Sequence, residues 1–235
     1  MPCRTYQTPE EAMREVAKEI ILRAIKMAKR KGRTISSSKA AWGRGVDVAT
    51  LDPRTPEGSR RLEAFLTPVR RQYTWYGLGP PEESNAVSWR SLNLPLWRRG
   101  LVRFLVTVSL FMKGTPLKNI LYRWMGAHIG KNVETMQMVW LDHYRRELIW
   151  IGDNTPIRAF TRITAHGYEG AGRFRYGLVE IGKGCRIGAG TGMGPIKIED
   201  GVRTRHSPRP IRAPLPCSSA SPCYAGMIGR RMCEG

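Results

Sequence analysis

The feature that most constrains this chain is an aliphatic residue, followed by a small or acidic one, that returns every six positions between 129 and 202. Copies of the pattern begin at Ile129, Ile151, Ile157, Ile163, Ile181 and Ile187. Side chains repeat at about 3.6 residues in a helix and at about 2 in a strand, so neither element fits. A period of six with Gly, Asn or Asp near a turn predicts a chain wound into a triangular prism, in which each short strand buries its aliphatic residue.

The copies are arranged around one histidine. The run Ile-Thr-Ala precedes His166, a polar excursion at 167–177 follows it, and further copies begin at Val179 and Ile187. This order of parts resembles the hexapeptide-repeat acyltransferases, which include the serine, maltose, galactoside and xenobiotic O-acetyltransferases, and the resemblance covers 117–202. It implies a mainly β fold, namely a left-handed parallel β-helix built from hexapeptide repeats and preceded by α-helices.

Three regions are expected along the chain. Residues 1–127 form a helical N-terminal region with loops, whose last helix caps the β-helix, and 128–202 form the β-helix itself. In 203–235 the period stops and the composition becomes basic and rich in Pro, Ser and Cys. We expect this tail to be disordered, or to be the product of a changed reading frame. The family normally continues with at least one more coil and a closing segment that contacts coenzyme A. Because the repeat stops early in this chain, its cofactor groove could be incomplete.

Two helices are predicted near the N-terminus. Residues 8–11, Thr-Pro-Glu-Glu, form a capping box with proline at the first helical position, and Gly32 ends the helix that follows. A second, shorter helix begins at Thr55. The polar, turn-rich segment 32–55 is predicted to connect rather than to pack.

Residues 94–124 differ from the rest in their apolar character. The run 101–112 is the most apolar in the chain, but it contains Arg103 and is too short to span a bilayer, which indicates a buried or interfacial helix. A further helix, starting at Pro116, leads into the first repeat and would cover it. Peripheral contact with a membrane through Arg98, Arg99 and the apolar run is the alternative; the covering role is favoured.

His166 is the candidate catalytic base. Acyl transfer to an alcohol needs a base that is neutral near pH 7, and imidazole meets that requirement. The family's general base stands at the matching place; the alternative is a surface histidine at a corner. By resemblance Asp142 would orient the histidine or contact the acceptor, although it could equally cap its own turn. Glu169, in the excursion, would orient the acceptor or the imidazole, or be solvated.

The resemblance also implies acetyl-coenzyme A as co-substrate and direct attack by the acceptor, with no covalent enzyme intermediate. The family stabilises the thioester oxygen with a backbone N–H that carries over to Ala189, and the flanking Gly188 and Gly190 would let pantetheine approach. Family members are usually trimers whose sites lie between subunits, so a homotrimer is expected. No metal is expected, because a zinc site of the related carbonic anhydrases needs three histidines and no second one stands close to His166 in the repeat.

The formal charge of +20 first suggests a nucleic-acid partner. The basic residues are spread along the chain, however, and no nucleic-acid-binding motif is present. The basic and aromatic run 70–76 could stack on bases, but a solvated helix end is favoured. Nucleic acid is therefore disfavoured, and the phosphates of coenzyme A fit the charge. The five cysteines form no disulfide framework and the first residues are not a secretory signal, so a cytoplasmic protein is expected. If the apolar run contacts a membrane, the protein would lie at its inner face.

The sequence thus favours an acetyl-coenzyme A-dependent O-acyltransferase that acts on a hydroxyl of a sugar or a similar small acceptor, with His166 as general base. The alternative is a non-catalytic scaffold or basic binding protein whose cofactor groove is incomplete.

Overall fold

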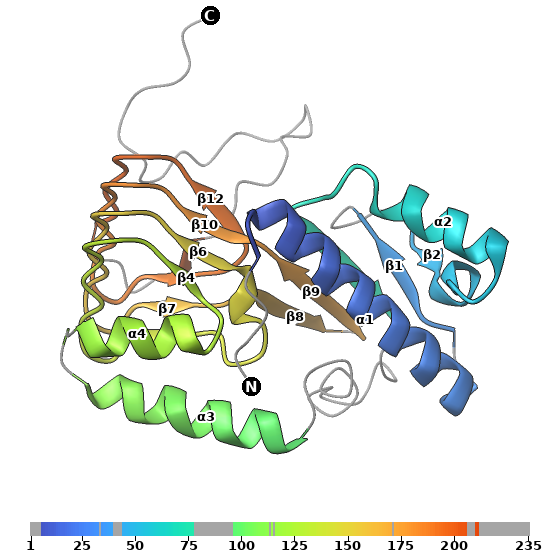
Figure 1. Cartoon of the computed structure of the whole chain (residues 1–235), viewed down its shortest axis with the longest axis horizontal. Helices are drawn as coiled ribbons and strands as arrows, with labels where there is room; N and C mark the ends of the chain where they lie inside the picture. The colour runs from blue at the N-terminus through green and yellow to red at the C-terminus, as the bar shows by residue number, and fades with distance from the viewer. Residues whose placement is uncertain are drawn as a thin grey trace, which may run out of the picture.

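The computed structural model of the chain describes residues 6–32, 34–39, 44–77, 96–112, 114, 116–170, 172–205 and 210–211. These residues form four α-helices and three β-sheets, one antiparallel and two parallel (Figure 1). Most of the predicted tail at 203–235 lies outside the described residues, as does all of 78–95.

The first two helices begin where the capping signals predicted. Helix α1 (Pro9–Lys31) starts after Thr8, whose hydroxyl accepts the Glu11 N–H at 3.1 Å, and it ends at Gly32 with a left-handed φ of 60°. Helix α2 (Pro56–Leu66) starts after Thr55, whose hydroxyl accepts the Gly58 N–H at 3.0 Å. Both predictions are confirmed, because the capping signal depends only on local sequence.

The antiparallel sheet joins the N-terminal part of the chain to the polar excursion. Its order is β2-β1-β3-β9-β8. The strands are β1 (Ser36–Ser38), β2 (Val46–Asp47), β3 (Gln72–Tyr76), β8 (His166–Gly170) and β9 (Arg173–Gly177). Strand β3 pairs with β9 from Gln72 opposite Gly177 to Trp75 opposite Phe174. Segments about a hundred residues apart in sequence therefore lie side by side.

Two predictions about this N-terminal part are wrong. Segment 32–55 does more than connect, since it supplies β1, β2 and the 3-10 helix Val48–Leu51. Residues 70–76 are not a helix end but contain β3, in which Tyr73, Thr74 and Trp75 are buried. The aromatic and β-branched residues of β3 suit a pleated, buried strand, and this preference outweighs the charge of the two arginines before it.

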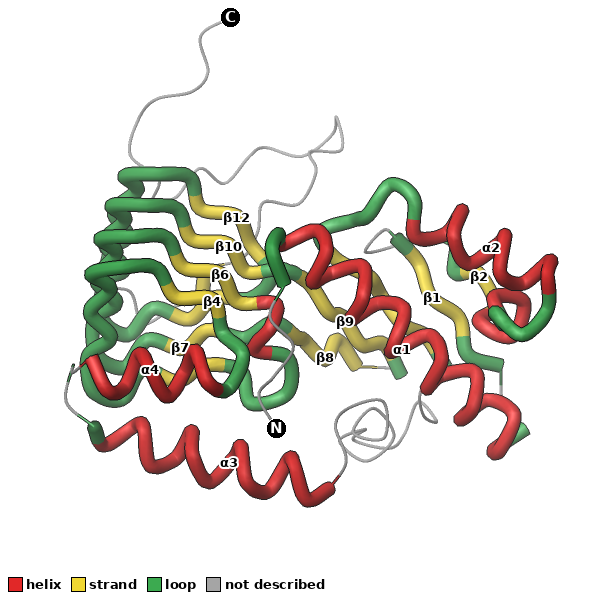
Figure 2. The backbone as a smooth tube through the Cα atoms, in the orientation of Figure 1, coloured by secondary structure: helices red, strands yellow, loops and turns green. Residues whose placement is uncertain are grey.

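The two parallel sheets stack strands from successive copies of the six-residue pattern (Figure 2). One sheet contains, in spatial order, β12 (Ile196–Ile198), β10 (Val179–Ile181), β6 (Ile149–Ile151) and β4 (His128–Ile129); the other contains β13 (Pro210–Ile211), β11 (Gly192–Met193), β7 (Arg162–Ile163) and β5 (Trp140–Leu141). Equivalent aliphatic residues pair in register, as Ile151 does with Ile181 and Ile181 with Ile198. A third row of parallel bridges runs through Thr135, Ile157 and Ile187.

The fold class predicted from the sequence, a mainly β chain forming a left-handed parallel β-helix, is wrong. The described residues form a mixed structure in which four helices and a five-stranded antiparallel sheet accompany the parallel sheets. The six-residue period accounts only for the parallel strands. It carries no information about 36–76, whose strands pair with the excursion, and that pairing makes both the N-terminal part and the excursion β-structured.

Helices α3 (Leu96–Phe111) and α4 (Pro116–Trp124) lie side by side at one edge of the parallel sheets (Figure 1). Helix α4 contacts the first repeat through buried polar groups. Lys118 Nζ donates to the Met136 carbonyl at 2.6 Å, and Tyr122 Oη donates to the Val139 carbonyl at 2.8 Å. Ser109 of α3 donates to Tyr122 Oη at 3.0 Å. Within the described ranges, no helix has both the length and the apolar content needed to cross a membrane.

Lys118 gives a testable pH dependence. Burial lowers the pKa of its ammonium from 10.5 to about 8. Between these values the unfolded chain binds more protons than the folded one, so the free energy of unfolding contributed by Lys118 should rise with pH. We expect Lys118→Met to remove this increment. Urea unfolding of both proteins at pH 7.5 and pH 9.5 gives the rise in the free energy of unfolding between the two pH values. The rise in the wild type minus the rise in the variant is the contribution of Lys118, and equal rises in both proteins would contradict the lowered pKa.

Candidate active site

The structure brings Asp142 and His166 together. Leu141 of β5 pairs in register with Ile163 of β7, so the residues that follow the two strands are neighbours. Asp142 Oδ2 is hydrogen-bonded to Nδ1 of His166 and accepts the Ala165 N–H at 2.8 Å. The other carboxylate oxygen accepts the Tyr144 N–H at 2.7 Å. Both alternatives considered for Asp142 are therefore present as contacts, because one oxygen caps the turn while the other reaches the histidine.

The environment fixes the charge of Asp142. Its side chain is fully buried, which by itself raises the pKa, but the positive form of His166, its hydrogen bond and the Tyr144 N–H lower the pKa by more. The net pKa lies below the ordinary value, so the carboxylate is ionised at neutral pH. An ionised carboxylate only accepts hydrogen bonds, so in neutral His166 the proton lies on Nδ1 and the lone pair lies on Nε2.

Aromatic rings surround the imidazole, whose side chain is 15% exposed. The ring centroids of Tyr144, Phe174 and Tyr176 lie 5.2, 5.7 and 6.3 Å from that of His166. Sequence reasoning missed this ring cluster. The alternation of Phe174 and Tyr176 along 173–177 was the available signal, because alternate residues of a strand face the same side.

His143 is a second histidine near the site, with its ring centroid 6.5 Å from that of His166. Burial lowers its pKa to about 4; the Asp142 carboxylate opposes this effect, while His166, Arg103 and Arg146 add to it. His143 is therefore neutral at pH 7 and adds no positive charge beside His166.

The turn after Asp142 is held by two buried arginines. Arg145 Nη1 lies 3.1 Å from a carboxylate oxygen of Glu19 on α1 and 3.1 Å from one of Glu147. Arg146 Nε donates to the Met125 carbonyl, just after α4, at 2.7 Å. The Arg145 side chain is 1% exposed. Burial alone lowers the pKa of its guanidinium, but Glu147 and Glu19 raise that pKa by more, so Arg145 stays charged. The position of Asp142 thus depends on α1 and on the end of α4.

The excursion at 167–177 is a β-hairpin rather than the polar loop expected. Strands β8 and β9 pair from His166 opposite Tyr176 to Gly170 opposite Arg173, with an irregularity between Tyr168 and Gly170. Glu169, the third predicted catalytic residue, lies on β8, but its side chain is outside the part of the chain that the structure describes.

The predicted cofactor residues lie away from the histidine within one chain. Gly190 has a left-handed φ of 71° and donates to the Ala159 carbonyl at 3.0 Å, while the Gly188 N–H donates to Thr204 Oγ1 at 2.8 Å. Between them, the Ala189 N–H has no hydrogen-bond partner among the described residues. Strand β11 follows Ala189 and pairs in register with β7, which precedes His166. Ala189 and His166 therefore lie at opposite ends of this strand pair.

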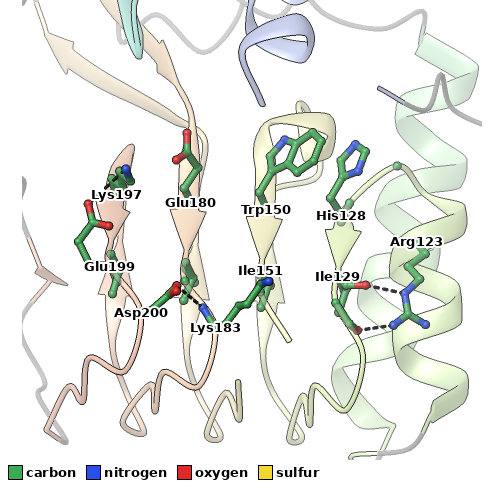
Figure 3. Close-up of a pocket in the computed structure, with 17 residues that line it drawn as sticks. Arg123, His128, Ile129, Trp150, Ile151, Glu180, Lys183, Lys197, Glu199 and Asp200 are labelled. Carbon is green, nitrogen blue, oxygen red and sulfur yellow. Dashed lines mark hydrogen bonds and ion pairs between the residues drawn. The ribbon is translucent and has the colours of Figure 1, made fainter. Parts of the chain in front are cut away.

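A separate groove of about 700 Å³ runs along the outer face of the sheet β12-β10-β6-β4 (Figure 3). In it His128 stacks on Trp150, with ring centroids 3.6 Å apart. Arg123 of α4 closes one end and donates to the carbonyls of Ile129 and Gly130 at 2.8 and 2.5 Å. Neither Asp142 nor His166 lines this groove.

As for metals, no cluster of three or more His, Cys, Asp or Glu side chains within the described ranges could hold an ion. Comparisons of the chain with models of known protein families, with curated proteins and with solved structures gave no match.

Proposed function

We propose that the protein is an acetyl-coenzyme A-dependent O-acyltransferase that moves an acetyl group to a hydroxyl of a sugar or a similar small acceptor. The observation that carries the proposal is the contact between buried Asp142 and Nδ1 of His166. This contact orients the imidazole, directs its lone pair to Nε2 and would stabilise the imidazolium once it forms.

The proposed chemistry uses one histidine twice. Nε2 of His166 takes the proton of the acceptor hydroxyl while the hydroxyl oxygen attacks the thioester carbon. The oxygen of the tetrahedral intermediate carries the negative charge, and a backbone N–H such as that of Ala189 stabilises it. When the intermediate collapses, the carbon–sulfur bond breaks and the imidazolium returns its proton to the leaving thiolate. His166 ends neutral, and the products are the acetyl ester and free coenzyme A.

A complete site of this kind would need a second copy of the chain. His166 and Ala189 lie at opposite ends of the strand pair β7–β11 within one copy, so they would meet only across an interface between copies. This separation supports the homotrimer proposed from the resemblance. The formal charge of +20 supports a phosphate-bearing co-substrate, and acetyl-coenzyme A is available in the cytoplasm, where we place the protein.

Calorimetric titration of the purified chain with acetyl-coenzyme A tests the proposal. We expect saturable binding with a Kd between about 1 μM and 1 mM, the range in which working enzymes bind substrates. Release of free thiol with a panel of hydroxyl acceptors then measures transfer. His166→Ala is the matched variant for binding, because it should retain the affinity for acetyl-coenzyme A. A folded chain that does not bind would favour the scaffold or basic binding protein instead.

A further inference from the structure

The outer surfaces of α3 and α4 are apolar. On each helix, large apolar side chains at spacings of three and four residues face away from the protein, and Phe104 and Phe111 are 63% and 75% exposed. The set comprises Leu101, Phe104, Val108, Phe111, Leu117, Ile120 and Trp124. We call these seven side chains the apolar face. They make up most of the large hydrophobic side chains that are exposed in the described part of the chain.

The apolar face is not the side by which these helices pack on their own protein. Helix α3 buries Val102, Val106 and Ser109, and α4 buries Tyr122, on the opposite surface. Each helix therefore has an inner surface that packs on the fold and a second apolar surface that is exposed among the residues that the structure describes. Exposed large apolar side chains gathered on two neighbouring helices mark an interaction site.

The charge of this segment identifies the class of partner. Residues 96–124 contain no Asp or Glu. They contain six basic residues: Arg98, Arg99, Arg103, Lys113, Lys118 and Arg123. Among them Arg103 and Arg123 are exposed, whereas Lys118 is buried. Two copies of the apolar face brought together would bring the exposed arginines of both copies together, in a chain whose net charge is already +20. An anionic partner with an apolar interior is complementary to both properties.

We propose that the apolar face docks on an anionic lipid bilayer, with α3 and α4 lying in the plane of the interface. Helix α3 has 16 residues and is about 24 Å long at about 1.5 Å per residue, so it lies in the surface rather than crossing it. Phe104, Phe111 and Trp124 enter the boundary between headgroups and acyl chains, while Arg103 and Arg123 remain at the headgroups. This docking is independent of the proposed acyl transfer.

Sedimentation of the full chain with lipid vesicles tests the proposal. We expect binding to phosphatidylcholine vesicles that contain about one third phosphatidylglycerol, and binding that weakens with salt. The double variant Phe104→Ser and Phe111→Ser should lower the partition coefficient by about tenfold or more. Leu22→Ser is the matched control, because Leu22 is an exposed apolar residue of α1, and it should bind as the wild type does.

A second variant separates charge from apolar contact and does not disturb packing. Arg103→Gln, on the exposed surface of α3, should lower binding to the anionic vesicles by about fivefold and leave binding to pure phosphatidylcholine unchanged. Failure of the wild type to sediment with anionic vesicles would overturn the proposal, and so would unchanged binding of a double variant that melts like the wild type. If sedimentation velocity shows that the double variant loses an oligomer while vesicle binding is unaffected, the apolar face is an interface between copies instead.

Discussion

Replacing His166 by alanine is expected to lower the rate of acetyl transfer by about 10²- to 10⁴-fold, the range that a positioned general base contributes. The variant loses the group that would accept the hydroxyl proton. Its fold should persist, because the imidazole is partly exposed and its strand is held by pairing with β9. Thiol release under saturating acetyl-coenzyme A measures the rate, and thermal melting confirms that the variant is folded.

Two further variants make the result specific. His128→Ala removes another partly buried histidine, which lies in the groove of Figure 3, and should leave the rate unchanged. Asp142→Asn keeps the size of the side chain but removes the charge that would stabilise the imidazolium, so the rate of transfer should fall. An Asp142 that only caps its turn would change stability without lowering the rate of the folded variant. Full activity in His166→Ala would rule out the proposed mechanism.

Replacing Arg145 by methionine is expected to lower the free energy of unfolding by about 3 kcal/mol. The guanidinium is buried and lies between the carboxylates of Glu19 and Glu147, which are 38% and 14% exposed. Without it, two carboxylates stay close together with one less positive charge, and α1 loses its ion pair to the turn after Asp142. Urea unfolding followed by circular dichroism measures the change.

Arg23→Met is the matched control for this prediction. Arg23 pairs with the same Glu19 at 2.8 Å, but its side chain is 33% exposed, so its loss should cost less than about 1 kcal/mol. Equal destabilisation by both substitutions would show that burial of Arg145 is not what makes its ion pairs matter.

The elements that the sequence predicted well are those whose signals are local. The caps at Thr8 and Thr55 lie within a few residues of the N–H groups they bind, so the sequence alone contains the interaction. The parallel strands recur with the aliphatic residues of the six-residue period. Strand β1 is a run of three serines with no β-branched or apolar residue, and it is a strand only because β2 and β3 pair with it.

In the candidate site, too, some residues could be predicted from the sequence and others could not. The resemblance pointed to His166 and Asp142, and the register of β5 with β7 brings them together. The supporting contacts could not be predicted, because they join distant segments: Glu19 and Arg145 are 126 positions apart. Their pairing depends on how α1 lies across the antiparallel sheet, and the sequence carries no periodic signal for that arrangement.

The pairing of β3 with β9 has a consequence for how the chain is made. Strand β3 emerges from the ribosome long before residues 173–177, which complete one of its edges. Until those residues are synthesised, an unpaired strand edge that includes Tyr73 and Trp75 has no native neighbour on that side, and such edges recruit other chains. Closing so distant a contact also makes folding slow. The N-terminal part is therefore expected to need protection by chaperones during synthesis. The hairpin that begins at His166 can pair with β3 only after residues 173–177 have been made.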